Sequence, residues 1–402
     1  MEKTEQLLKQ KKKIIYVMLV AGIMLAAFNL RPGITSVGPL INDIQKDLHL
    51  AHWSAGLLTS LPLIAFAVMS PIVPTIANRL SNGWTLITGL IIIIIGLFVR
   101  TTPVLFFLFL GTFLVGVGIA TLNVILPVIV KDKFPHKFAL MTSVYTTSMS
   151  GLAALASGLS VPLASGMGLG WRNTLLVWAI PAVVAIIIWV ILLRLDQKEK
   201  PQKIQLEIQE KSNKIWRSSL AWKVALFMGL QSFLFYVTIT WLPDILHSKG
   251  LSRETAGWLL SITQIIGLPA NFSVPIIAEK FDSQKKVAIG ICSSSIIGFT
   301  ILLLSTSYLF ILISIVFLGL GLGGAFSLAL AFIGMRARDA KQSAQLSGMA
   351  QSIGYIFAAV GPILIGSLFD MTNMWTVPIV TIITVGLLTA FFGSRAGENR
   401  YV

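Results

Sequence analysis

Long apolar stretches alternate with short polar connections along almost the whole chain. Twelve stretches of about 18 residues or more carry few charges, and this is the length that an α-helix needs to cross a bilayer core. They predict membrane-spanning helices over residues 14–41, 53–77, 84–101, 103–130, 137–163, 172–194, 218–246, 254–278, 286–305, 308–334, 341–369 and 374–393. The predicted fold class is therefore all-α, a polytopic membrane protein with twelve transmembrane helices.

One longer polar segment, residues 195–217, divides this pattern. It mixes lysines with glutamates and has no sustained apolar face, so it is interpreted as a linker. The linker separates a six-helix bundle over residues 14–194 from a second one over residues 218–393. Residues 1–13 and 394–402 are the terminal tails.

The two halves also resemble each other in sequence. The segment TAGWLLS at 255–261 is similar to SAGLLTS at 54–60, and Gly354 corresponds to Gly151. In both cases the two copies are separated by about half the chain length. Such a repeat is typical of secondary transporters, whose binding site lies between the halves near mid-membrane. We therefore predict two pseudo-repeated six-helix bundles.

Composition supports a membrane protein, and the distribution of charge predicts its orientation. The 402 residues are 55% hydrophobic and 12% charged, with a mean hydropathy of +0.84, which excludes a soluble enzyme. Five basic residues fall on one side of the predicted helices: Lys46, Arg100, Arg172, Lys249 and Arg253. The other basic residues, apart from Arg31, lie in the termini, the linker and the opposite connections, so these are expected to be cytoplasmic in a plasma-membrane protein. This bias accounts for the net charge of +15 without nucleic-acid binding.

Residue types that perform chemistry are sparse. The single cysteine, Cys292, excludes an intrachain disulfide and a cysteine metal cluster. His49, His52, His136 and His247 fall in connections and are interpreted as solvated loop residues. Neither a GxxxxGK[ST] nor an HExxH motif occurs, so we expect no enzyme, no metal and no cofactor. The polar start runs into the first helix without a small-residue cleavage site, which argues against a removable signal peptide.

Arg31 is a basic residue inside a predicted helix, about 5 Å beyond its centre. A lone arginine at that depth costs at least ~2.5–3.5 kcal/mol, so it should face a wet cavity and have a partner there. No acid falls in the middle of a predicted helix. The nearest candidate, Asp244, is expected to lie roughly 13 Å from Arg31 along the helix axis. The partner is therefore expected to be an anionic substrate. The structural alternative is that Arg31 binds backbone carbonyls at the kink introduced by Pro32 and Gly33.

Uncharged polar residues at similar depth could complete a site. Asn29 lies on nearly the opposite side of the helix from Arg31, so it either contacts substrate or caps the free carbonyl of Phe28. Other amides and phenols either join helices or line the cavity. These candidates are Asn123, Tyr145, Gln231, Tyr236, Gln264, Gln351 and Tyr355. Trp53 and Trp241 are expected to be interfacial anchors rather than gates.

Small residues recur every four positions in the fifth and eleventh predicted helices. They suit close helix contact and are interpreted as flexible seams of a rocking carrier, with plain structural packing as the alternative. The residues are Ala154, Gly158, Pro162 and Gly166, and Gly354, Ala358, Pro362 and Gly366.

Several segments are similar to those of one transporter family. NLRPGITSVGPL at 29–40, AGLLTSLPLIAFAVMSP at 55–71, GVGIATLNVILPVIVKDKFP at 116–135 and TWLPDIL at 240–246 resemble the cyanate and nitroimidazole transporters of the major facilitator superfamily. The resemblance implies two six-helix bundles around a central cavity, working by alternating access. It also implies that Asn29, Arg31 and Pro32 form a first-helix signature, with Arg31 facing the cavity.

Two motifs of the superfamily are incomplete in this chain. Asn78 stands before Arg79 where an acidic residue is usual, which weakens the inference of a charge-relay latch. Gly158 and Pro162 are the only parts of the GxxxGPxxGG pattern of proton-driven drug antiporters, so drug–proton antiport is not implied.

These features together predict a secondary active transporter for a small anionic or polar heterocyclic solute. The alternative is a facilitative uniporter or a multidrug-type efflux carrier for a neutral molecule, with Arg31 structural. Importing a monovalent anion costs about 2.3 kcal/mol per 100 mV, and no mid-helix carboxylate relays protons, so exchange or efflux is favoured. The expected partners are the solute, membrane lipid and a coupling proton or exchanged anion, and the protein is expected to be a monomer. A channel would lack saturable counterflow, and a sensor would need a larger soluble domain.

Overall fold

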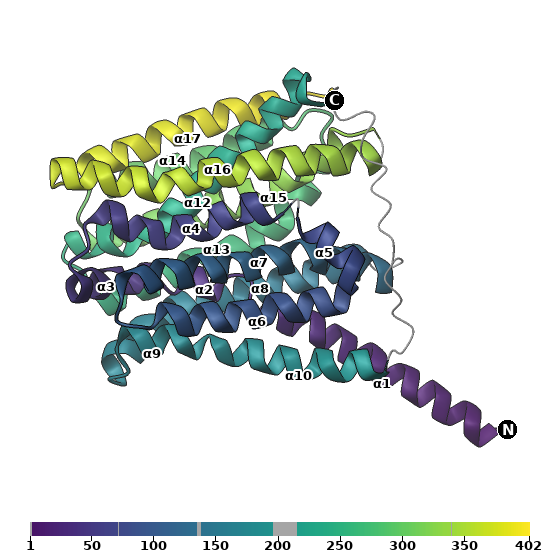
Figure 1. Ribbon diagram of the computed structural model, residues 1–402. Coiled ribbons are helices and arrows are strands. Elements are labelled where there is room, and N and C mark those ends of the chain that lie inside the picture. The colour runs from purple at the N-terminus through teal and green to yellow at the C-terminus, as the bar shows by residue number, and fades with distance from the viewer. Residues whose placement is uncertain (1, 71, 135–137, 196–214, 339) are drawn as a thin grey trace.

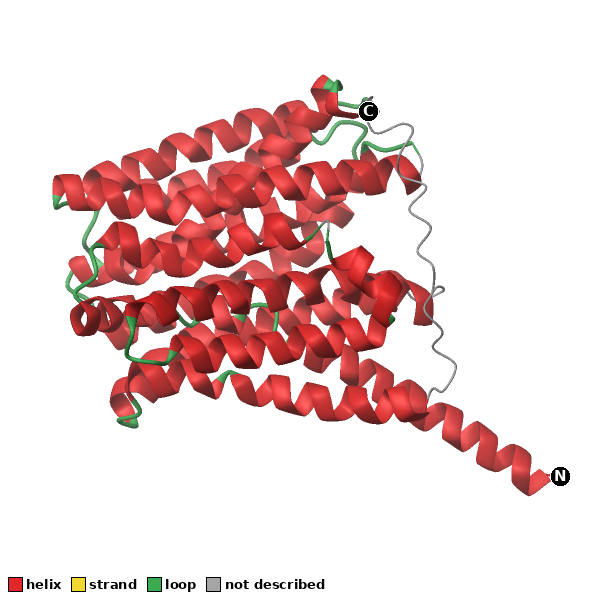
Figure 2. Cartoon of the chain, in the orientation of Figure 1, coloured by secondary structure: helices red, strands yellow, loops and turns green. Residues whose placement is uncertain are grey.

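The computed structural model describes residues 2–70, 72–134, 138–195, 215–338 and 340–402. Every regular element in these ranges is a helix (Figure 2). Within these described ranges, twelve segments are long and apolar enough to cross a membrane. The predicted all-α class with twelve transmembrane helices is confirmed. Most of the predicted linker, residues 196–214, lies outside the described ranges, so the proposed domain boundaries stay a prediction.

The helices follow the predicted stretches closely. The first six spans contain α1 (Glu2–Ala27), α2 (Pro32–Thr35), the 3-10 turn η1 (Gly38–Leu40), α3 (Ile41–Leu48), α4 (His52–Met69), α5 (Val73–Leu80), α6 (Asn82–Arg100), α7 (Leu105–Lys133), α8 (Phe138–Val161), the π-helical turn η3 (Pro162–Gly166), α9 (Gly170–Val177) and α10 (Ala179–Leu195). The last six are α12 (Ser219–Ser248), α13 (Arg253–Glu279), α14 (Lys285–Leu304), α15 (Tyr308–Met335), α16 (Ala340–Thr372) and α17 (Thr376–Ala396).

Three of the predicted helices are interrupted, the sixth of them at Trp178 between α9 and α10, and one helix begins earlier than expected. The first is broken between Ala27 and Pro32 and continues to Leu48, because proline has no N–H to extend the α-helical ladder. The second divides into α4 and α5 in a segment where the sequence has Pro71 and Pro74. Helix α1 starts at Glu2, ahead of the apolar stretch, because the polar N-terminal residues are mostly good helix formers.

The helices run roughly alongside one another between two ends of the molecule (Figure 1). Both termini lie toward one end, and α3 lies at the other, which is called the distal end below. The halves meet where α4 packs on α16 and α8 packs on α13.

Glycines allow the backbones to approach closely at these two contacts. A Cβ on Gly158 would come within 2.7 Å of the Trp258 ring, and one on Gly366 within 2.7 Å of the His52 carbonyl oxygen. Gly166, in contrast, has no neighbour within 4 Å of such an atom. Two of the small residues singled out in the sequence therefore lie between the halves, where any movement of one half against the other would occur.

Candidate substrate-binding site

The break in the first span positions Arg31. Pro32 occupies the first position of α2, where a missing N–H costs no hydrogen bond. The N–H groups of Ile34 and Thr35 donate to the Arg31 carbonyl oxygen at 2.9 and 3.0 Å. Arg31 therefore stands at the start of a new short helix, and its side chain is partly buried.

Three aromatic rings surround the Arg31 guanidinium. Its central carbon lies 4.8 Å from the ring centroid of Phe235, 5.7 Å from that of Phe326 and 5.8 Å from that of Tyr236. Nη1 also donates a long hydrogen bond of 3.5 Å to the Tyr236 hydroxyl. Aromatic faces attract a cation without neutralising it. In the part of the chain that the structure describes, no carboxylate forms an ion pair with Arg31.

Arg100 makes the backbone contact that Arg31 could have made. It is 1% exposed, and its Nη1 donates to the Gly33 carbonyl oxygen at 2.8 Å, within the broken first span. The sequence analysis counted Arg100 among the basic residues on one side of the predicted helices and did not predict this contact. A long side chain at the end of α6 can fold back into the bundle.

A central cavity with about 870 Å³ of empty space lies between the two halves. Its walls come from the broken first span, α4, α7 and α8 on one side and from α12, α15 and α16 on the other. Seven of the residues singled out in the sequence line it: Arg31, Asn123, Tyr145, Gln231, Tyr236, Gln351 and Tyr355. The structure therefore brings these side chains together from five separate segments of the chain.

A second cavity, here called the side chamber, has about 630 Å³ of empty space. It lies between α8 and the helices α12, α13 and α15, and it shares Arg31, Phe235 and Phe326 with the central cavity. Gln264 lines this chamber and donates to the Ser157 hydroxyl at 2.8 Å. Asn271 also lines it. Asn271 lies seven residues beyond Gln264 in the same helix, so the helical period could have identified it.

Several polar groups in the cavities lack a protein partner. Gln231 is 1% exposed, and its Nε2 donates to Met228 and Ser232, but its Oε1 is buried without a partner. Among the described residues, the side chains of Asn123, Tyr145 and Tyr355 also form no hydrogen bond with the protein. Buried polar groups normally have partners, so these atoms are available to a bound molecule or to water.

Asn29 lines neither cavity. It is 4% exposed, and its Nδ2 donates to the Leu25 carbonyl oxygen at 2.7 Å, one turn back along α1. The expected bond to the carbonyl of Phe28 is not the one that forms.

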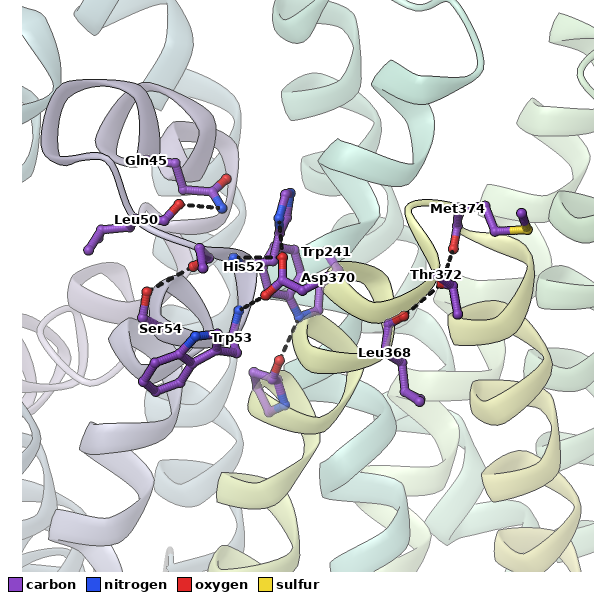
Figure 3. Close-up of polar contacts among 12 residues, drawn as sticks. Gln45, Leu50, His52, Trp53, Ser54, Trp241, Leu368, Asp370, Thr372 and Met374 are labelled. Atoms are coloured by element: carbon purple, nitrogen blue, oxygen red, sulfur yellow. Dashed lines mark hydrogen bonds and ion pairs between the residues drawn. The ribbon is translucent and has the colours of Figure 1, made fainter.

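At the distal end an acid from the second half binds the first half, in a contact called the distal closure below. Asp370, in α16, accepts hydrogen bonds from the backbone N–H groups of His52 and Trp53 at 3.1 and 2.8 Å (Figure 3). It also contacts the His52 Nδ1 at 2.8 Å. These backbone groups start α4, whose own N-cap residue, Ala51, has no capping side chain. Asp370 therefore supplies across the interface the cap that α4 lacks.

Trp241 and His52 are part of this closure, which corrects two expectations. Trp241 is fully buried, with Nε1 donating to the Pro362 carbonyl oxygen at 2.9 Å, so it is not an interfacial anchor. His52 stacks against Trp241 and Phe369 with centroid distances of 5.7 and 4.3 Å, so it is not a solvated loop residue. Both were misjudged because their partners are distant in sequence.

Further contacts join the halves at the same end. Arg253 pairs with Asp43, and Asn42 donates to Asp244. Asp244 thus has its partner on α3 rather than at Arg31. No group of three or more potential metal ligands occurs among the described residues.

Comparison with known proteins identifies the family. The sequence profile of the Major Facilitator Superfamily matches residues 23–362 and 224–399. This chain belongs to the major facilitator superfamily. Members are secondary transporters, not enzymes, and the chain is accordingly a multi-pass membrane transporter of a small molecule.

Relatives within the superfamily cover nearly the whole chain. "Uncharacterized transporter YycB" of Bacillus subtilis is 47% identical over 97% of this chain and 96% of that protein. The "2-nitroimidazole transporter" of Escherichia coli is 37% identical over 96% of this chain and 97% of its own. "Cyanate transport protein CynX" of Escherichia coli is 24% identical over 87% and 90%. The resemblance to cyanate and nitroimidazole transporters is thereby confirmed.

A solved structure confirms the fold. A bacterial homologue of the human lysosomal transporter Spinster, in an inward-facing and occupied conformation, superimposes with a TM-score of 0.74 over 96% of both chains. The two sequences are 15% identical, so this likeness shows the major facilitator fold alone.

Proposed function

We propose that this superfamily member moves a small anionic or polar heterocyclic solute across the plasma membrane by alternating access, with Arg31 as the anion contact. The observation that carries the proposal is a cation held among three aromatic rings at the junction of two cavities, without a carboxylate partner in the described chain. An anion entering between the halves would supply the missing negative charge. The guanidinium fork suits carboxylate and similar planar oxyanions.

Arg100 weakens the structural alternative for Arg31. If the role of Arg31 were to bind carbonyl groups at the helix break, its N–H groups would be expected to lie on the backbone there. Arg100 binds the Gly33 carbonyl oxygen instead, and the Arg31 guanidinium donates its hydrogen bond to the Tyr236 hydroxyl. This division of roles favours substrate contact for Arg31.

The other lining groups suit a polar substrate. The central cavity offers phenol and amide groups from both halves, among them Asn123, Tyr145, Gln231 and Tyr355. Such groups can hydrogen-bond ring nitrogens or oxyanions without adding charge. Relatives named as transporters of 2-nitroimidazole and cyanate are consistent with a small polar or anionic cargo. Asn29 is proposed only as a neighbour that shapes the helix break.

The proposed orientation places both termini in the cytoplasm. It follows from the excess of lysine and arginine at the end that carries the termini and puts the Asp370 closure on the outer side. With the interior negative, anion efflux is assisted, and uptake against a gradient needs a coupled proton or an exchanged anion. The protein is proposed to work as a monomer, because each half contributes to one cavity.

The first test replaces Arg31 by Gln, which keeps hydrogen-bonding capacity and removes the charge. Counterflow in proteoliposomes of an anionic substrate, found by screening cyanate, small carboxylates and nitroimidazoles, should fall to background. Arg172→Gln is the matched control, because Arg172 pairs with Asp47 at the distal end and lines neither cavity. Both variants should express and give a monodisperse protein. Transport by Arg31→Gln with ordinary affinity would refute the ligand role.

The same assay distinguishes a carrier from a channel. A carrier exchanges labelled for unlabelled substrate, so counterflow should saturate and be accelerated by substrate on the opposite side. Flux that rises linearly with concentration and shows no such acceleration would contradict alternating access.

A further inference from the structure

The rings of Phe235, Tyr236 and Phe326 form a cage around the Arg31 guanidinium. Phe235 from α12 and Phe326 from α15 both face the guanidinium, and both line the central cavity as well as the side chamber. Each ring is only partly buried, so part of its surface is accessible from the cavities. A molecule that reaches Arg31 therefore meets these two rings.

Aromatic faces distinguish between kinds of anion. The face of a phenyl ring carries negative electrostatic potential, so it does not replace the hydration shell of a small inorganic anion. A planar conjugated anion can place its charged group at the guanidinium edge and its own ring against a neighbouring ring. Such aromatic pairs contribute favourable energy beyond the burial of apolar area.

The arrangement of the two cavities also places a bound molecule beside these rings. The two cavities have about 870 and 630 Å³ of empty space and meet at the cage. Because Phe235 and Phe326 line both cavities, a molecule in either one contacts the same two rings.

We infer that Phe235 and Phe326 are specificity-determining residues that select a planar conjugated anion, of the aromatic carboxylate class, over a small inorganic anion. This inference rests on the proposed function, because it takes Arg31 as the contact for the charged group. It adds two residues that the sequence did not single out.

The test compares benzoate with cyanate on the purified full-length protein by isothermal titration calorimetry. Benzoate should bind at least ten times more tightly than cyanate. Phe326→Leu, which keeps an apolar side chain but removes the ring, should raise the Kd for benzoate about 2- to 10-fold and leave that for cyanate unchanged. Phe235→Leu should behave in the same way and serves if the first variant does not fold.

Phe272→Leu is the matched control. Phe272 is 65% exposed on α13 and lines neither cavity, so its replacement should change neither affinity. Cyanate binding as tight as benzoate binding, or equal weakening of both anions by the Phe326 and Phe235 variants, would overturn the inference.

Arg31→Gln separates this inference from the proposal on which it rests. Loss of both anions in Arg31→Gln, together with no discrimination in the phenylalanine variants, would leave Arg31 as the anion contact and refute the ring selection. Benzoate binding that survives in Arg31→Gln, or no anion binding by the unmodified protein, would refute both.

Discussion

Two arginines in the first half illustrate what a sequence can reveal about single residues. The position of Arg31 in an apolar stretch indicated its depth, because charge is rare at mid-membrane. Its ring partners could not be predicted, because Phe235 and Phe326 lie in the second half and look like ordinary apolar helix residues. The contact of Arg100 with the Gly33 carbonyl oxygen was not predicted for a related reason, since counting charges does not show which way a side chain at a helix end turns.

Arg31→Lys tests whether geometry or charge matters at the cage. Lysine keeps the charge but loses the planar fork, so one charge-assisted hydrogen bond of about 1.5–3 kcal/mol should be lost. The Kd for an anionic substrate should rise roughly 10- to 100-fold in a binding titration. Arg172→Lys at the distal end should leave it unchanged. Full affinity in Arg31→Lys would show that the positive charge alone, and not the planar fork, is needed for binding.

At the scale of helices, apolar length predicted the spans but not how they end or what caps them. Pro32 indicated a kink in the first span, and the structure has a full interruption between Ala27 and Pro32. The cap of α4 could not be predicted, because Asp370 lies far from His52 in sequence and in the other half. Local capping rules find an acid only when it is next to the helix start.

Removal of the Asp370 side chain should release this closure. Asp370→Ala leaves the first N–H groups of α4 without their acceptor, so the distal end should open more often. In a Cys292→Ser background, a cysteine at the fully buried position Thr59 should react several-fold faster with a membrane-impermeant maleimide. Glu254→Ala, which removes an exposed acid at the start of α13, is the control. Equal labelling rates in both variants would show that Asp370 does not hold the end closed.

For the whole molecule, the apolar pattern and the internal repeat were sufficient to predict the fold. The apolar pattern reflects the thickness of the bilayer, and the repeat reflects two similar halves, so neither depends on particular side-chain contacts. The position of the central cavity was also predictable, since amides and phenols are costly in lipid and so gather between the halves. Asn271, Phe235 and Phe326 were missed. In the sequence these three residues look like ordinary packing residues, and only the assembled helices show that they line a cavity.

The most direct measurement compares a carboxylate with its uncharged amide. Benzoate and benzamide have nearly the same shape and differ in charge. Isothermal titration calorimetry would measure the binding of each ligand to the unmodified protein and to Arg31→Gln. If Arg31 is the anion contact, the unmodified protein binds benzoate much more tightly, and Arg31→Gln loses that preference while its affinity for benzamide is retained. An undiminished preference for benzoate in Arg31→Gln, or no preference in the unmodified protein, would contradict this account.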